Sequence, residues 1–122
     1  MRQDLEQEEQ DNISVTNILL SSLESIHSLI QESPEVIGQH LSSIISLLLH
    51  LGQASPFMKV RITALKCLGL FPVSSISTHL LYTHQNKVID GLGSCLDDKK
   101  RLVRKEAVSS RSEWYLLGFK DS

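Results

Sequence analysis

Aromatic residues are scarce in this sequence: one Trp, two Tyr and three Phe make up 5% of its 122 residues. Any core must therefore be filled mainly by Leu, Ile and Val, as it is in helical repeat proteins. Hydrophobic residues as a whole reach 41%, which is typical of a folded chain rather than a disordered one. The length leaves room for one domain with a modest core.

Cysteine is scarce too, with only Cys67 and Cys95 in the chain. Neither has a second cysteine close by, so the paired spacing of zinc and iron–sulfur ligands is missing. Two cysteines are also too few for a disulfide scaffold. We interpret both as small apolar residues of a protein that works in a reducing compartment.

Patterns for catalysis or metal binding are missing. The five histidines are His27, His40, His50, His79 and His84. None has a partner four positions away, the spacing that places two ligands on one face of a helix. The sequence also lacks a Ser-His-Asp order, a glycine-rich phosphate loop and an inward pair of carboxylates. We therefore expect no catalytic residue, no metal and no cofactor.

Long apolar runs and a strong excess of positive charge are also missing. The richest apolar stretch, Ile44 to Leu51, is too short to span a bilayer. Arg2 leads into acidic residues instead of the apolar run of a signal peptide. The net charge is −2, whereas nucleic-acid-binding domains are usually basic. We expect a protein of the cytoplasm and nucleus, with no membrane association, and the net charge does not indicate a nucleic-acid-binding domain.

What the sequence does contain is a series of helical patterns. Residues 1–12 are acidic and polar, and they predict a disordered tail. Residues 13–118 form one helical domain, and residues 119–122 form a short C-terminal tail. The predicted helices span about 13–31, 35–51, 57–71, 78–96 and 97–118, with a candidate kink at residues 83–84 in the fourth. Helices two, three and five are predicted to begin at Ser33-Pro34, Ser55-Pro56 and Asp97-Asp98.

The last helix repeats an earlier one at an offset of 43 positions. Its Val103, Arg104, Ala107, Val108 and Trp114 correspond to Val60, Arg61, Ala64, Leu65 and Phe71. A repeat of this length is typical of HEAT-type helical hairpins. The sequence therefore predicts an all-α fold: a fragment of a HEAT-type α-solenoid with about five helices, one orphan helix followed by two hairpins.

The last helix differs from its earlier copy on the face that would meet a following repeat. Lys105, Arg111 and Glu113 stand where the earlier helix has Ile62, Leu68 and Leu70. The terminal repeats of a solenoid need a polar outer face. We therefore interpret the C-terminal hairpin as a capping repeat that ends the solenoid.

Basic residues gather around the start of the last helix: Lys99, Lys100, Arg101, Arg104 and Lys105. Three interpretations stay open for this cluster. It is a solvated helix start in which Arg104 bonds the acids of the preceding turn, a docking surface for an acidic partner, or a contact to nucleic acid.

Two aromatic residues near the end of the last helix have different predicted roles. Trp114 stands at the position of Phe71 and is predicted to pack in the core. Tyr115 lies beside Arg104, Val108 and Arg111, and this mixed aromatic, arginine and aliphatic patch has the composition that interface hot spots favour. The predicted partner-binding surface therefore combines Tyr115 and Arg111 with the basic cluster.

The run LDDKKRLVRKEAVSSRSEWYLLG, residues 96–118, resembles the C-terminal end of a known HEAT-repeat family. This is the family first named for methyl-methanesulfonate sensitivity, the large scaffold of the cytosolic iron–sulfur targeting complex. The similarity continues upstream through VRITALKCL to about Val15. Two features depart from the family pattern: its large N-terminal part is missing, and the ending FKDS differs.

This resemblance implies a non-enzymatic scaffold. In the family, the C-terminal domain docks a WD40-propeller subunit and a small subunit with a reactive cysteine. Through these partners, iron–sulfur clusters reach apo-proteins of DNA replication and repair. The alternatives are a generic HEAT-repeat adaptor, or a truncated copy with little function of its own.

The first predicted helix has an apolar stripe but no hairpin partner in the sequence. The stripe consists of Leu19, Leu23, Ile26 and Ile30. Exposed, each of these residues would forgo about 1.5–3 kcal/mol of burial. We therefore expect the stripe either to turn onto the next helix or to bind a second copy of the chain through residues 13–31.

Overall fold

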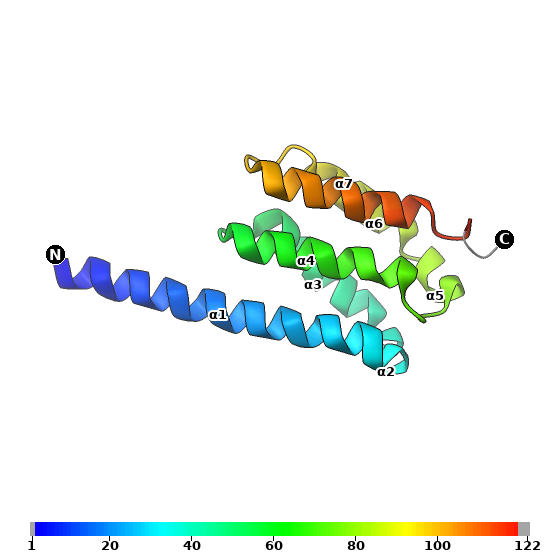
Figure 1. Ribbon diagram of the computed structural model, residues 1–122, viewed down its shortest axis with the longest axis horizontal. Coiled ribbons are helices and arrows are strands. Elements are labelled where there is room, and N and C mark those ends of the chain that lie inside the picture. Colours follow the sequence, from blue (N-terminus) through cyan, green and yellow to red (C-terminus); the bar gives the residue numbers. More distant parts are fainter. Residues whose placement is uncertain (1, 120–122) are drawn as a thin grey trace.

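The computed structural model describes residues 2–119, with side chains from residue 6 onward, and over this range the chain is helical without a strand. The elements are α1 (Arg2–Glu32), α2 (Pro34–Gln39), α3 (Leu41–Ala54), α4 (Met58–Leu70), the short 3₁₀ turn η1 (Phe71–Val73), α5 (Thr78–Tyr82), α6 (Gln85–Cys95) and α7 (Arg101–Tyr115). Figure 1 shows them as stacked layers. The predicted all-α, HEAT-like fold is confirmed.

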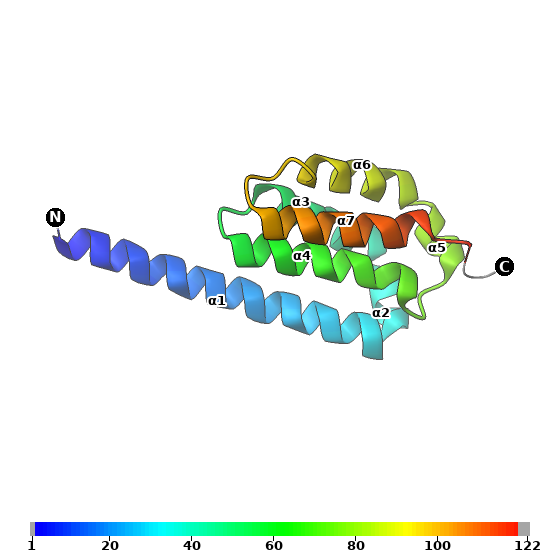
Figure 2. The ribbon, with the colours of Figure 1, turned by 45° about the horizontal axis from the view of Figure 1, so that its top comes forward.

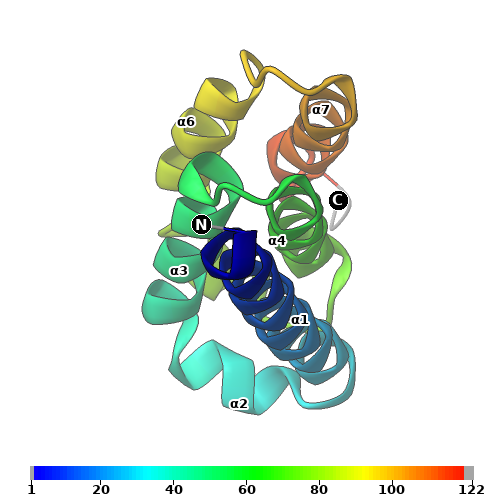
Figure 3. The same ribbon diagram turned by 90° about the vertical axis from the view of Figure 1, so that its left-hand side faces the viewer.

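The helices form two rows. α1, α4 and α7 follow one another in the first row, and α3 and α6 make up the second (Figure 3). Each helix of the first row packs on the next, and α3 and α6 cover α4 and α7 from the side. The helices of the first row run in the same direction, so their N-terminal ends lie on one side of the molecule (Figures 1 and 2).

The core between the rows is made mainly of aliphatic side chains, as the scarcity of aromatic residues predicts. Trp114 and Phe71 are the largest fully buried side chains, and their ring centroids are 6.3 Å apart. The indole Nε1 of Trp114 donates a hydrogen bond to the carbonyl of Leu68, 2.8 Å away. The predicted core position of Trp114 is therefore confirmed.

The acidic segment predicted as a disordered tail is helical in the structure, where α1 begins at Arg2. Glu and Gln are good helix formers, and acidic residues near a helix N-terminus interact favourably with the helix dipole. The N-terminal half of α1 projects beyond the starts of α4 and α7 (Figures 1 and 2). The predicted domain boundaries stay a prediction, and residues 120–122 of the predicted C-terminal tail lie outside the described residues.

The helix predicted over residues 35–51 is two helices in the structure. The chain leaves the helical conformation at His40, with φ −121° and ψ 23°, and α2 lies across the end of the second row (Figure 3). Gly38 in the last turn of α2 lowers the helix propensity there. In the helix predicted over residues 78–96, the candidate kink is a full break between α5 and α6.

One predicted helix start is correct, and two helices begin later than predicted. Ser33 is the residue before α2 and Pro34 its first residue, but the Ser33 side chain makes no capping hydrogen bond. α4 begins after Phe57, whose N–H donates to the Ser55 hydroxyl, and α7 begins after Lys100, whose N–H donates to Asp98. Ser55 and Asp98 therefore order the turns that precede these helices rather than cap them.

The stripe predicted to lack a partner on the first helix is not exposed. Leu23 and Ile30 are buried, and Leu19 and Ile26 are partly buried against the same core. The Cys67 thiol of α4 lies 3.6 Å from the Leu23 carbonyl, so α1 and α4 are in direct contact. This stripe therefore packs inside the molecule, and the reason for expecting it to bind a second copy is removed.

One segment within α1, Glu6–Glu32, is long and apolar enough to cross a membrane by length and composition alone. A single segment of this kind near an N-terminus is a weak indication, because signal sequences and core helices pass the same test. In this chain its Leu23 and Ile30 are covered by protein.

Gly118 ends the last turn after α7 with φ 91°, a conformation that residues with a Cβ rarely adopt. A Cβ at this position would collide with the hydroxyl of Tyr82 on α5. We expect Gly118→Ala to lower the free energy of unfolding by about 1 kcal/mol. Urea denaturation checks this, with Gly93→Ala as control, because a Cβ at Gly93 meets its nearest atom at 3.5 Å. Equal stability of both variants would contradict the expectation.

Candidate partner-docking surface

The start of α7 is fixed by an ion pair between the two hairpins. The Arg61 guanidinium on α4 donates from Nε to Asp98 Oδ2 over 2.9 Å and from Nη2 to Asp98 Oδ1 over 3.2 Å. Its Nη1 donates to the Ser55 carbonyl at 2.9 Å. Both side chains of the pair are nearly buried, so we name Arg61 and Asp98 the clamp.

Arg104 repeats part of this arrangement one repeat later. Its Nη1 donates to the Asp98 carbonyl at 2.7 Å, just as Arg61 donates to the carbonyl of Ser55. Donor and acceptor are six positions apart in both bonds. Arg104 therefore shapes the turn before α7, which is the structural role that the sequence left open for it. It contacts a backbone carbonyl of that turn rather than the expected acidic side chain.

The surroundings of Asp98 favour its charged form. Burial alone would raise the pKa of its carboxyl, but hydrogen bonds from the Lys100 N–H and the Arg61 guanidinium, with the charges of Arg61 and Arg104, outweigh burial. The net effect is a pKa below the usual value of 3.8. Asp98 is therefore ionised near neutral pH and holds the first turn of α7 against α4.

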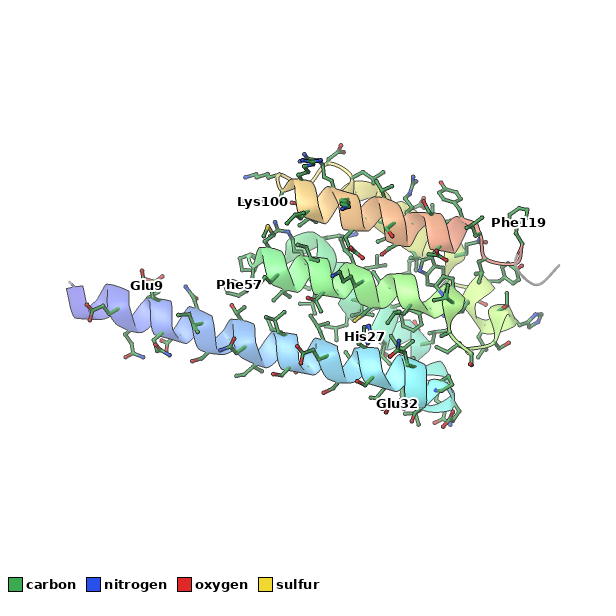
Figure 4. All side chains as sticks on the ribbon, viewed as in Figure 1. Glu9, His27, Glu32, Phe57, Lys100 and Phe119 are labelled. Atoms are coloured by element: carbon green, nitrogen blue, oxygen red, sulfur yellow. The ribbon has the colours of Figure 1, made fainter. Side chains whose placement is uncertain are left out.

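The structure places most of the predicted basic residues together at one end of α7. Lys99, Lys100 and Arg101 are exposed where the loop meets the helix, and Lys105 is exposed one turn further on. Figure 4 shows Lys100 at this end, above Phe57 and the start of α4. Because Arg104 is half-buried and bonded, the exposed cluster consists of the other four cations.

Arg111 and Tyr115 form a second part of the surface, further along α7. Arg111 Nε donates to the Ile89 carbonyl of α6 at 3.0 Å, and its guanidinium carbon lies 5.1 Å from the centre of the Tyr115 ring. This stacking is a cation–π contact, and it holds Tyr115 while half of that side chain stays exposed. With Leu96, Val108 and Ser112, the pair lines a small groove of about 110 Å³.

Exposed apolar side chains complete the surface: Val108 belongs to the predicted patch around Tyr115, whereas sequence reasoning missed Leu102 and Leu116. Leu102 and Val108 on α7 and Leu116 directly after it are 44–56% exposed. The outer face of α7 is therefore mixed rather than polar, although Lys105 and Arg111 lie on it as predicted. The repeat agrees for Val108, which stands at the position of the buried Leu65.

The cysteines are packed and poorly reactive. Burial raises the pKa of the Cys67 thiol to about 11 and also raises that of Cys95. Their thiols donate to the carbonyls of Leu23 and Gly52 on neighbouring helices. Among residues 6–119, no group of three or more His, Cys, Asp or Glu side chains is placed to hold a metal ion.

Comparisons with a protein family and with individual proteins point to the same relatives. Residues 4–72 match the family MMS19_C, described as RNAPII transcription regulator C-terminal. The chain is 48% identical over 101 residues to the MMS19 nucleotide excision repair protein homolog of Xenopus laevis and 44% identical over 101 residues to that of Homo sapiens, covering 83% of this chain in both. It is 38% identical over 107 residues, or 86% of this chain, to the DNA repair/transcription protein mms19 of Schizosaccharomyces pombe. The chain spans about a tenth of the length of these relatives.

Proposed function

The chain belongs to the MMS19 C-terminal family, a family of DNA repair and transcription proteins, and on that premise we propose that it is a non-enzymatic scaffold. It docks the WD40-propeller and reactive-cysteine subunits of the cytosolic iron–sulfur targeting complex. Iron–sulfur clusters then reach apo-proteins of DNA replication and repair, in the cytoplasm and nucleus. The match of residues 4–72 to the family and the identity of 44–48% to two MMS19 homologues over 83% of this chain support the proposal.

The outer face of α7 is the docking surface in this proposal. It consists of the exposed cations Lys99, Lys100, Arg101 and Lys105, with Arg111, Tyr115, Leu102, Val108 and Leu116. The single observation that carries it is the Arg111–Tyr115 stack beside exposed apolar side chains. An aromatic side chain held rigidly and half exposed loses little conformational entropy on binding, and such anchors dominate interface energies. The cations around it suit an acidic partner.

A pull-down with the purified propeller subunit tests this surface. We expect the double variant Lys105→Glu and Tyr115→Ala to bind at least about tenfold more weakly than the wild type, the effect of losing one hot spot. Both side chains are exposed, so helical circular dichroism should not change. Lys59→Glu, an exposed cation at the start of α4, is the matched control and should bind normally.

Three other outcomes would redirect the proposal. Normal binding by the double variant would remove the α7 surface while leaving the scaffold function in place. No binding by the wild type would leave the generic HEAT adaptor or a copy with little function of its own. Salt-dependent binding to DNA would favour the nucleic-acid interpretation of the basic cluster.

A further inference from the structure

α4 and α7 use the same stripe of side chains to pack on the preceding helix of their row. In α7 it is Val103, Ala107, Ser110 and Trp114; in α4 it is Val60, Ala64, Cys67 and Phe71. All eight side chains are buried. Ser110 donates to the Leu65 carbonyl of α4, and Cys67 donates to the Leu23 carbonyl of α1. Each stripe thus has two small residues between two large ones, which brings the helices close together.

α1 carries the same pattern, but without a neighbour on that face. The two carbonyl acceptors, Leu65 and Leu23, are 42 positions apart. At the same offset, the stripe positions of α4 correspond to four residues of α1, which we name the open stripe: Ile18, Ser22, Ser25 and Leu29. All four side chains are exposed, Ile18 by 65% and Leu29 by 40%. No described element covers them.

The serines of the open stripe are bonded within their own helix. Ser22 and Ser25 donate to the carbonyls of Ile18 and Ser21, at 2.9 and 3.1 Å. Ser110, at the position of Ser25, donates instead to the neighbouring helix. Because a hydroxyl rotates freely between nearby acceptors, Ser25 can make the same bond to a helix placed on the open stripe.

α7 carries the complementary face. In α4, the face that receives α7 includes Leu65 and Leu68, whose carbonyls accept from Ser110 and Trp114. The offset of 43 places Val108 and Arg111 at these positions in α7, on the docking surface described above. Arg111 folds back onto α6 and Tyr115, so Val108 stays 55% exposed beside it.

The charges at the two ends agree with this pairing. If Ser25 of one copy bonds Val108 of another, Ile18 lies beside Arg101 of that copy, since the helices of the row run in parallel (Figure 1). The part of α1 before Ile18 then reaches the loop that precedes α7. That part carries the exposed Asp11, which continues the open stripe two turns before Ile18, and the loop end carries Lys99, Lys100 and Arg101. Opposite charges therefore meet along one parallel register.

We infer that the chain associates with a second copy of itself, head to tail, with the open stripe of α1 on the outer face of α7. The new contact extends the first row by repeating the contacts that already join α1 to α4 and α4 to α7. It is heterologous, because the two surfaces differ, so association continues beyond the dimer. A partner bound at α7 blocks this association.

Sedimentation of two charge variants tests the arrangement. The mean molecular mass of the wild-type protein is expected to rise with protein concentration. The rise is smaller at high salt, because salt screens the attraction between the charged ends. Ile18→Glu removes one surface and Val108→Glu the other, so each alone stays monomeric, with association at least about tenfold weaker. An equimolar mixture forms a dimer and nothing larger, because it retains one intact pair of surfaces. Ile13→Glu is the matched control: Ile13 is 54% exposed on another side of α1, and its variant associates like the wild type.

Each remaining result would overturn the inference. A wild type that is monomeric at every concentration excludes self-association. A mixture that stays monomeric, with both variants folded by circular dichroism, excludes the head-to-tail pairing. A Val108→Glu variant that dimerises normally shows that two α1 helices pair with each other instead. The propeller pull-down is independent of all three results, so the proposed function is tested separately.

Discussion

Replacing Trp114 with Ala is expected to unfold the domain or nearly so. Trp114 is fully buried against Phe71, and removing a side chain of this size costs about 3–5 kcal/mol in a packed core. The change also leaves the Leu68 carbonyl without its indole donor. Folded domains have only about 5–15 kcal/mol of stability, so this loss is a large part of the reserve. Chemical denaturation followed by circular dichroism measures it.

Trp114→Phe separates the two contributions. Phe keeps much of the packing against Phe71 but lacks the N–H, and the Leu68 carbonyl still accepts from the Phe71 N–H, so we expect a smaller loss that includes about 0.5–1.5 kcal/mol for the one hydrogen bond. Trp114 is the only tryptophan in the chain, so its fluorescence reports on this site alone. Native emission at the wavelength of water-exposed indole would contradict the burial.

Replacing Asp98 with Ala is expected to lower the free energy of unfolding by about 1.5–3 kcal/mol, the range for hydrogen bonds to a charged group. The change breaks the clamp and leaves the nearly buried Arg61 with only the Ser55 carbonyl as partner. Asp97→Ala is the matched control, because Asp97 is the exposed neighbour in the same turn. A cost no larger than that of the control would show that the clamp contributes nothing.

The clamp also predicts how stability depends on pH. The pKa of Asp98 is lowered in the folded state, so the unfolded chain takes up the proton first as the solution becomes acidic. Its contribution is therefore complete above the usual pKa of 3.8 and disappears as the pH falls through the lowered value. The difference between wild type and Asp98→Ala should shrink over that window. A constant difference down to acid unfolding would contradict the assignment.

Internal repetition made much of this fold predictable. The offset of 43 aligned Trp114 with Phe71 in the sequence, and in the structure the two rings lie together in the core. It also paired Arg61 with Arg104, and both donate to the carbonyl six positions before them. A repeat compares the chain with itself, so it reports on packing even where single-residue propensities are ambiguous.

Features that depend on neighbours in space were not predictable in this way. The break at His40 lies inside a continuous apolar pattern, so periodicity alone could not find it. The acidic segment reads as disordered by composition, although Glu and Gln are good helix formers. The first helix has two faces that can pack against a neighbouring helix. The prediction left the more apolar face, with Leu23 and Ile30, without a neighbour, but in the structure this face is buried.

The candidate surface was likewise predictable in part. Clustering of cations at the start of α7 follows from sequence alone. Arg104 bonds the backbone of the turn at Asp98, whereas Lys105 is exposed to a partner. The conformation of that turn decides this difference, and residue spacing alone does not predict it. The partner contacts themselves stay a prediction.

The arrangement of α1, α4 and α7 in one row has a consequence for how the molecule opens. α4 is held on two sides within the row, whereas α1 and α7 each have one neighbour there. In a linear array of this kind, stability is close to a sum of terms between adjacent units, and loss of structure starts at the ends. Opening should therefore proceed inward from either end and reach α4 last. A ligand bound to α7 stabilises α1 only through the contacts that both helices make with α4. The two ends of this short chain can therefore unfold locally almost independently of each other.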